Sequence, residues 1–221
     1  MAVVNVTRVE ALAGMLRTAI QRGTYAPGDR LVELRIAEAN GVSQATVRDA
    51  LRLLERQGWV VSQPRRGVMV RAFSRAEAEE VFALTAAVES LALRWVFPRM
   101  NKALRDALRG HVRAARRASL DNKTALGLAM LFEMHLALAR ITAVEQPITA
   151  EMLDRLHTAV QILESVRRAR SRLPARELDP LTAGHELFCD RLDARDLIGA
   201  DETLRRQITL YGGMVLDALR G

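Results

Sequence analysis

Residues 41–71 read GVSQATVRDALRLLERQGWVVSQPRRGVMVR, and this stretch decides the fold of the first third of the chain. Ser43 follows a glycine turn and suits a helix N-cap, because its hydroxyl can accept a hydrogen bond from a backbone N–H of the first turn. The apolar residues after it recur at helical spacing: Val47, Ala50, Leu51 and Leu54. They predict the buried face of a short helix that ends at Gly58.

A two-stranded ribbon is expected after this helix. Residues 59–62 (WVVS) and 68–70 (VMV) are strand-forming runs, and the turn between them is Pro64-Arg65-Arg66-Gly67. Gly67 suits a turn position with positive φ, and its lack of a side chain also lets the backbone approach a phosphate closely.

The sequence before residue 41 supplies the partner helices. Thr7 can cap a helix that runs to about Gln21, residues 31–32 suit a short strand, and residues 33–40 suit a second helix. Two short helices joined by so tight a turn, followed by a ribbon tipped with arginines, predict a winged helix-turn-helix over residues 1–74. In such a domain the helix after the turn enters the DNA major groove, and the wing contacts the backbone or the minor groove.

The charge distribution favours DNA contact in this part of the chain. Residues 1–74 contain 11 arginines, no lysine and 6 acids (net +5), whereas residues 75–221 contain 22 basic and 20 acidic residues (net +2). The residues expected to contact DNA are Ser43, Gln44, Thr46, Arg48, Arg52, Arg65, Arg66 and Gly67. For Arg52 the alternative is an ion pair with Glu55, since the later turns of such a helix leave the groove.

The rest of the chain, residues 75–221, is expected to form an all-helical bundle. Ser74-Arg75-Ala76-Glu77 is a capping-box pattern. Helices are predicted over residues 75–97, 101–118, 123–142, 148–171, 177–194 and 199–219. Their apolar residues recur at i, i+3, i+4 and i+7 without sustained heptads, which favours a globular bundle over a long coiled coil. The fold class is therefore mainly α, with an N-terminal winged helix-turn-helix domain and a C-terminal helical domain.

Composition excludes several classes of protein. The single cysteine, Cys189, excludes an internal disulfide framework and a multi-cysteine zinc site. No apolar run approaching the roughly 18 residues of a membrane span is apparent, and residues 1–16 lack the pattern of a secretory leader. A soluble cytoplasmic protein is expected.

Several motifs resemble the GntR family of bacterial transcription regulators. They are Leu31-x-Glu33-x-x-Ile36-Ala37, Gly41-Val42-Ser43, Val47-Arg48-Asp49-Ala50-Leu51-x-x-Leu54-x-x-x-Gly58 and Pro64-Arg65-Arg66-Gly67. The helical part is similar to the FCD domain of the FadR-like branch, with landmarks at Phe132-x-x-His135, His185-Glu186-Leu187-Phe188 and Arg195-Asp196. The resemblance implies a transcription regulator whose helical part senses a small carboxylate-like effector, an organic acid. A homodimer on a palindromic DNA operator is expected, because the contacts of one small winged helix rarely provide enough specificity and two-fold symmetry doubles them. We expect a repressor that the effector releases from the operator.

In the DNA-binding part, Gln44 and Thr46 stand where that branch often has Arg and Pro. Glutamine favours adenine where arginine favours guanine, so a different base preference is expected.

The resemblance also implies an effector pocket with a divalent metal ion at its floor. The usual ligands are an Asp four residues before a His and two later histidines, and here His135 and His185 match two of these positions. Leu131 replaces the Asp and Gln207 replaces the last histidine, so the metal set of His135 and His185 is incomplete and a weakly held metal or none is expected. An Arg four residues before a Glu is also usual, and here Thr85 precedes Glu89.

The residues expected to line the effector pocket are Thr85, His135, His185 and Gln207. With this altered set, the effector is expected to depend less on metal chelation and to be more apolar than a small hydroxy acid. His111 and His157 have no partner at a suggestive spacing and are expected to be surface or packing residues.

Two other functions are alternatives to a ligand-responsive regulator. A metal-dependent hydrolase carried on the helical bundle is the main alternative, but the sequence has no Ser/His/Asp, Cys/His or clustered carboxylate arrangement to support one. An architectural DNA binder would leave the long helical part without a role. The chain is therefore expected not to be an enzyme.

Overall fold

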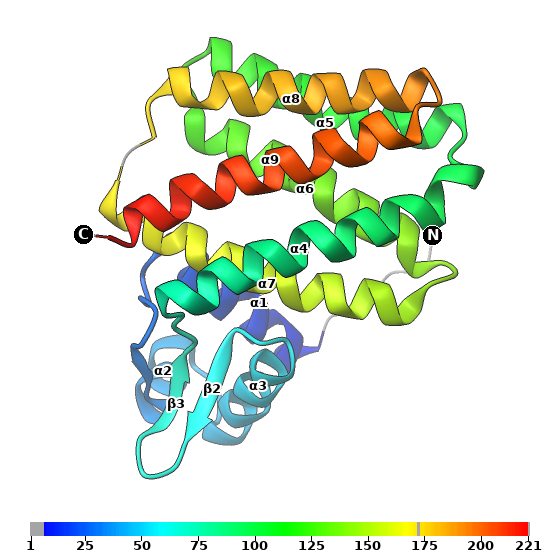
Figure 1. Ribbon diagram of the computed structural model, residues 1–221. Coiled ribbons are helices and arrows are strands. Elements are labelled where there is room, and N and C mark those ends of the chain that lie inside the picture. The colour runs from blue at the N-terminus through cyan, green and yellow to red at the C-terminus, as the bar shows by residue number, and fades with distance from the viewer. Residues whose placement is uncertain (1–6, 172, 221) are drawn as a thin grey trace.

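The computed structural model describes residues 7–171 and 173–220. The first part contains α1 (Arg8–Arg22), β1 (Arg30–Leu31), α2 (Glu33–Asn40), α3 (Gln44–Arg56), β2 (Val60–Gln63) and β3 (Gly67–Val70). These elements form a small unit at one end of the molecule, where the β2–β3 hairpin extends beside α3 (Figure 1). The predicted winged helix-turn-helix is confirmed.

The local signals in the sequence explain where these elements begin and end. Ser43 caps α3 by accepting a hydrogen bond from the Thr46 backbone N–H, and Gly41 ends α2 in the left-handed conformation. The three strands lie in the order β1-β3-β2, all antiparallel, with Val60 opposite Val70 and Gln63 opposite Gly67. This register closes the wing around the Pro64–Gly67 turn.

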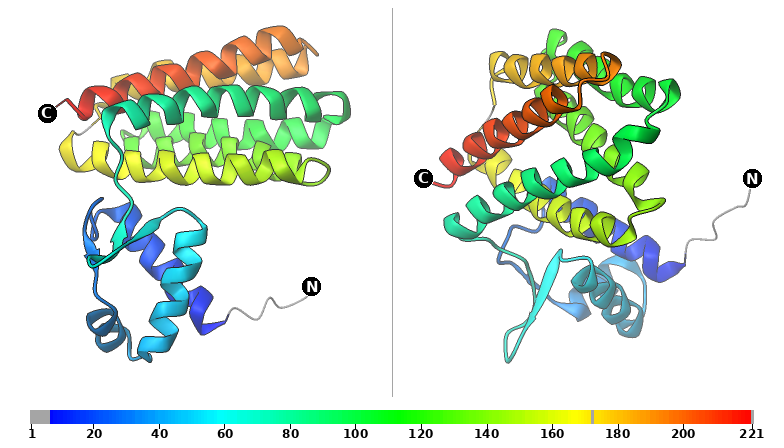
Figure 2. Two further views of the ribbon diagram at one scale, coloured as in Figure 1. Left: turned by 60° about the horizontal axis from the view of Figure 1, so that its bottom comes forward. Right: turned by 45° about the vertical axis from the view of Figure 1, so that its right-hand side comes forward.

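The second part is the predicted helical bundle. It contains α4 (Arg75–Val96), a 3₁₀ turn (Phe97–Arg99), α5 (Lys102–Leu120), α6 (Thr124–Ala143), α7 (Pro147–Arg170), α8 (Ala175–Asp193) and α9 (Leu197–Ala218). The helices stack side by side above the winged unit (Figure 2). Each predicted end lies within two residues of the observed one, and the predicted capping box at Ser74 and Glu77 is present.

One helix of the bundle contributes a side chain to the core of the winged unit. Helix α7 of the bundle packs against α1 (Figure 1), and its Ile162 is fully buried in the apolar core of the winged unit. Thr158, one turn earlier on the same helix, lies against Gly58 just after α3. Helix α7 therefore forms a direct contact between the two parts.

Two bundle helices are apolar enough to qualify as membrane spans by length and composition alone. They are the segment Arg75–Arg99 and α6, both with a mean hydropathy of 1.4. The expectation from the sequence that no segment is apolar enough to resemble a membrane span is therefore wrong. Just over half of the first window is buried inside the protein (56%), but only 22% of the α6 window is, because one apolar side of α6 faces a cavity.

Candidate functional site

The exposed start of α3 presents polar side chains to solvent. Gln44 is exposed, and the Ser43 and Thr46 hydroxyls are hydrogen-bonded to each other at 2.9 Å. The Arg48 side chain is half exposed (53%), and its guanidinium lies 3.0 Å from the Glu33 carboxylate of α2. This ion pair links the two helices of the helix-turn-helix and leaves the outer side of Arg48 accessible.

The predicted alternative pairing of Arg52 is wrong. Arg52 pairs with Asp49 at 3.4 Å, one turn earlier on α3. Glu55 instead accepts a hydrogen bond from the Ser62 backbone N–H at 2.8 Å, which ties α3 to the first strand of the wing. The side chain of Arg52 remains exposed beside α3.

The wing tip carries two exposed arginines that form no ion pair with any residue that the structure describes: Arg65 and Arg66. Gly67 has the expected positive φ of 82°, and Arg65 also adopts the left-handed region with a φ of 64°. The Arg30 guanidinium lies over Gly67, with its Nε 3.4 Å from the place that a β-carbon would occupy. The candidate DNA-contacting residues on α3 and the wing thus lie at the end of the molecule farthest from the bundle (Figure 1).

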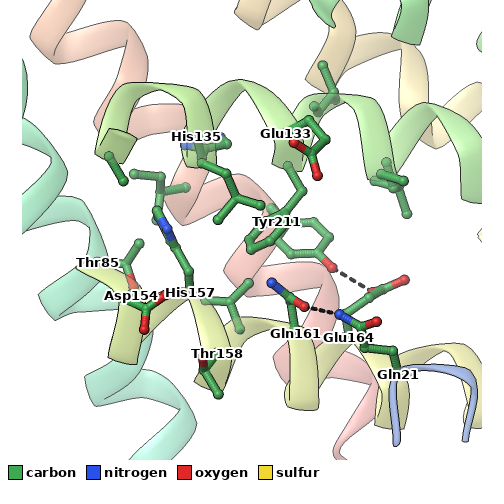
Figure 3. Close-up of a pocket in the computed structure, with 18 of the residues that line it drawn as sticks. Gln21, Thr85, Glu133, His135, Asp154, His157, Thr158, Gln161, Glu164 and Tyr211 are labelled. Carbon is green, nitrogen blue, oxygen red and sulfur yellow. Dashed lines mark hydrogen bonds between the residues drawn. The ribbon is translucent and has the colours of Figure 1, made fainter. Parts of the chain in front are cut away.

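A cavity of about 850 Å³ lies in the bundle and extends to the winged unit. Thr85, His135, His185 and Gln207, which were predicted to line an effector pocket, all line it. So does Leu131, which takes the place of the family's aspartate. Figure 3 shows His135, His157 and Thr85 around one part of the cavity and Gln161, Glu164, Tyr211 and Gln21 around another. The fold thus brings these four residues, which come from four different helices, to one cavity.

Glu89 organises the histidines in the cavity wall. Its carboxylate, only 1% exposed, accepts hydrogen bonds from His135 Nδ1 at 2.6 Å and from His157 Nε2 at 2.7 Å. Burial by itself raises the pKa of Glu89, but the charge and hydrogen bond of His135 and the hydrogen bond of His157 outweigh it and hold the pKa at about 2. Glu89 is therefore a carboxylate at neutral pH.

His135 and His185 continue this network. Their Nε2 atoms lie 3.0 Å apart, and His185 Nδ1 lies 2.7 Å from the Leu181 carbonyl oxygen, to which it donates. Since His135 Nδ1 donates to Glu89, a hydrogen bond between the two Nε2 atoms requires one ring to carry both protons. Burial and the charge of His135 lower the pKa of His185 to about 3, so His185 is neutral at neutral pH.

His157, expected to be a surface or packing residue, is a packing residue: it is 2% exposed and its ring makes a T-shaped contact with the Phe132 ring. It also forms a hydrogen bond with Glu89 at 2.7 Å, which the sequence analysis did not predict. No spacing in the sequence indicates this pairing, because Glu89 and His157 are 68 residues apart on two helices that meet only in the folded chain.

Thr85 and Gln207 are the neutral neighbours of this network. The Thr85 hydroxyl donates to the Val81 carbonyl oxygen at 2.7 Å. Gln207 is 5% exposed, and its Oε1 has no hydrogen-bond partner among the described residues. A methyl group built on Gly184 would overlap the Gln207 amide, so the glycine beside His185 makes room for this side chain. A buried acceptor without a partner is costly unless a ligand or water satisfies it.

A metal ion of the kind that the resemblance implies does not fit these residues. The two Nε2 atoms bond to each other, Leu131 is a buried apolar side chain, and Gln207 offers a neutral amide. Within residues 7–171 and 173–220, no three His, Cys, Asp or Glu residues are placed to hold a metal ion together. Protein zinc sites use three or four such ligands. Weak or absent metal binding stays a prediction, and it rests on this donor set.

Comparison with known proteins extends over both parts of the chain. Residues 8–70 match the family model described as bacterial regulatory proteins, gntR family, and residues 80–210 match the FCD domain model. Among curated relatives, the HTH-type transcriptional regulator YdhC of Bacillus subtilis (strain 168) is 32% identical over 37% of this chain. An HTH-type regulator from the TAR-I ttuE-ttuC' intergenic region of Agrobacterium vitis is 34% identical over 38% of it. The aligned stretches span 36% and 50% of those two relatives.

Solved structures share the fold along nearly the whole chain. E. coli McbR/YncC superposes with a TM-score of 0.82 at 18% identity, covering 96% of this chain and 98% of its own. A putative GntR transcriptional regulator from Rhodococcus sp. RHA1 gives a TM-score of 0.76 at 24% identity, covering 95% and 98%. At these identities the likeness concerns the fold alone.

Proposed function

The chain belongs to the GntR family of bacterial regulatory proteins and carries an FCD domain, and we propose that it is a homodimeric repressor that leaves a palindromic operator when an organic acid binds. That it is a transcription regulator with a DNA-binding and a ligand-binding domain follows from the family itself. The operator symmetry, the dimer, the repression and the effector are the proposal. Its main support is the set of exposed polar and arginine side chains on α3 and the wing.

The proposed contacts with DNA divide into two kinds. Gln44, Thr46 and Arg48 at the start of α3 would read base edges in the major groove, because the first turns of a recognition helix lie deepest there. Arg65 and Arg66 on the wing would bind phosphates, since the turn lies beside the helix and its cations are unpaired among the described residues.

A stripe of exposed apolar residues on α4 supports the homodimer. Leu84, Leu91 and Trp95 are 44%, 44% and 50% exposed, and their spacing of seven and four places them on one side of the helix. Large apolar side chains grouped on one exposed face mark an interaction surface. We propose that a second copy of the chain packs on this face, because a two-fold dimer carries two α3 helices, one for each half of a palindrome.

We place the proposed regulator in the cytoplasm, where its DNA target is. Its effector would bind in the cavity that contains Thr85, His135, His185 and Gln207. A cavity of about 850 Å³ is within the usual size range for a small-molecule site.

Selection of DNA fragments from the source genome on the purified protein, followed by footprinting, tests this function. The expected site is an inverted repeat whose half-sites are about one helical turn apart or a multiple of it. Sedimentation should give a dimer at micromolar concentration. A stable monomer, or a protected site without inverted symmetry, would contradict the proposal.

A further inference from the structure

The cavity is amphipathic, because its two long walls differ in character. The α6 wall presents a stripe of apolar residues spaced three and four apart: Ala125, Ala129, Phe132, Leu136, Ala139 and Ala143. The α7 wall presents a polar stripe at the same spacing: Asp154, His157, Gln161, Glu164 and Arg168. Because this apolar stripe of α6 faces the cavity, only 22% of the apolar window of the helix is buried. Unfilled apolar surface of this extent favours an apolar ligand body.

The inner part of the cavity, formed by Thr85, Glu89, His135, His185 and Gln207, is unfavourable for an anion. Glu89 is a buried carboxylate, and Thr85 provides no positive charge. His135 is already hydrogen-bonded to Glu89 at 2.6 Å. Gln207 Oε1 is a buried acceptor without a partner in the described chain. This inner part therefore suits a neutral group that donates a hydrogen bond, such as a hydroxyl.

The outer end of the cavity is formed by the DNA-binding domain and carries excess positive charge. Arg17 and Arg22 of α1 line it and form no ion pair with a described residue. Arg168 of α7 lies 3.7 Å from Glu164, but that carboxylate is already bound by Arg167 at 2.6 Å. Of the other acids that line the cavity, Glu133 is paired with Arg140 at 3.1 Å, and Asp154 lies beside Thr85 and His157, away from Gln161 and Glu164 (Figure 3). Arg17, Arg22 and Arg168 therefore give this end of the cavity an excess of positive charge, which favours an anionic group here.

We propose that the effector is an elongated amphipathic organic anion that bridges the two domains, with its acid group at Arg17 and Arg22 and a hydrogen-bond donor at Gln207. This rests on the proposed function, because it names the ligand class of the same cavity. The acid therefore lies at the end of the cavity opposite to the histidines. The ligand contacts α1 directly and so binds most tightly to one arrangement of the DNA-binding domain against the bundle.

Trp59 supplies a reporter at the correct end of the cavity. It is 2% exposed and lines the cavity beside α1, whereas the other tryptophan, Trp95, is half exposed on α4. In a Trp95→Phe protein, the fluorescence of Trp59 alone would follow ligand binding. Titrations would use ω-hydroxydodecanoate, dodecanoate, dodecanol and lactate as probes.

The expected order of affinity is ω-hydroxydodecanoate, then dodecanoate, then dodecanol, with no saturable response to lactate. Arg17→Gln should weaken binding of both long acids about tenfold and leave dodecanol unchanged, since one charge-assisted contact is lost. Gln207→Leu should remove the advantage of the hydroxy acid over dodecanoate. Arg8→Gln, on the same helix but outside the cavity, is the matched control and should bind all probes as the parent does.

Three results would overturn the inference: no saturable Trp59 response to the long acids, equal affinity in the Arg17→Gln and Arg8→Gln proteins, or tighter binding of lactate than of the long acids. Thermal unfolding of each variant shows whether it is folded. DNA binding without any probe is measured separately. If the protein binds its operator but gives none of the expected titration results, only the inferred ligand class is wrong. If the protein binds no operator, the proposed function is wrong.

Discussion

Gln21 of α1 donates a side-chain hydrogen bond to Gln161 of α7, so that an amide pair joins the DNA-binding domain to the helical bundle (Figure 3). Both residues also line the cavity. Any ligand that fills the space beside them contacts the junction between the domains.

Breaking this amide pair should loosen the docking of the two domains. We expect Gln161→Leu and Gln21→Leu each to reduce the docked population about two- to tenfold, because a net hydrogen bond contributes about 0.5–1.5 kcal/mol. The measurement is the rate at which trypsin cleaves after the exposed Arg71, between β3 and α4, and we expect this rate to rise in both variants. In a double-mutant cycle the two effects should not add. Fully additive effects would show that the two amides do not interact.

Arg48→Ala should weaken binding to the selected operator by about 1–3 kcal/mol and relax the base preference at one position, if Arg48 contacts a base. Fluorescence anisotropy with labelled operator and with a scrambled duplex measures both effects. Arg113→Ala changes an exposed arginine on α5 of the bundle and serves as the control. The Arg48→Ala protein should bind the operator more weakly than the Arg113→Ala protein, and equal affinities would show that Arg48 does not contact the DNA.

Arg65→Ala should weaken binding to all DNA sequences by a similar factor. Loss of one phosphate contact lowers the slope of log affinity against log salt by about 1. A salt titration of the operator and of unrelated DNA gives both slopes. An unchanged slope would mean that the wing tip does not contact phosphate.

Acid should destabilise the helical domain through Glu89 and His185. Their pKa values in the folded chain, about 2 and about 3, lie below the ordinary 4.5 and 6.5, so the unfolded chain binds more protons as pH falls. The contribution of His185 is complete above pH 6.5 and is lost on going down toward pH 3, and that of Glu89 is lost between pH 4.5 and pH 2.

Urea unfolding at about pH 7 and about pH 4.5 measures this loss, most of which belongs to His185. His185→Asn should shrink the difference between the two pH values, whereas His111→Asn, outside the cavity, should not. The same difference in both variants would contradict the assignment.

Elemental analysis of purified protein should find far less than one equivalent of zinc, nickel or manganese per chain. Two imidazoles and a neutral amide are a poor set for a divalent ion. Near one equivalent, lost in a His135→Ala and His185→Ala double variant, would show that the site holds metal after all.

The sequence predicted the elements well where local chemistry decides them. The Ser43 cap, the Gly58 stop and the Ser74 capping box each act within a few residues, and all three lie where expected. Contacts between distant helices were harder to predict. Glu55 binds a wing N–H in place of Arg52, and His157 meets Glu89 only because α4 packs on α7. The resemblance located the four cavity residues, but the contribution of α1 to the cavity required the folded chain.

Ile162 limits how freely this protein can exchange parts with its relatives. Because its side chain completes the apolar core of the DNA-binding domain while its helix forms a cavity wall, neither domain is a separable module. A chimera that joins this bundle to another winged helix would leave a hole or an overlap at that contact unless its own α1 matched. A functional chimera is therefore expected only when the contacting surfaces of α1 and α7 are transferred together.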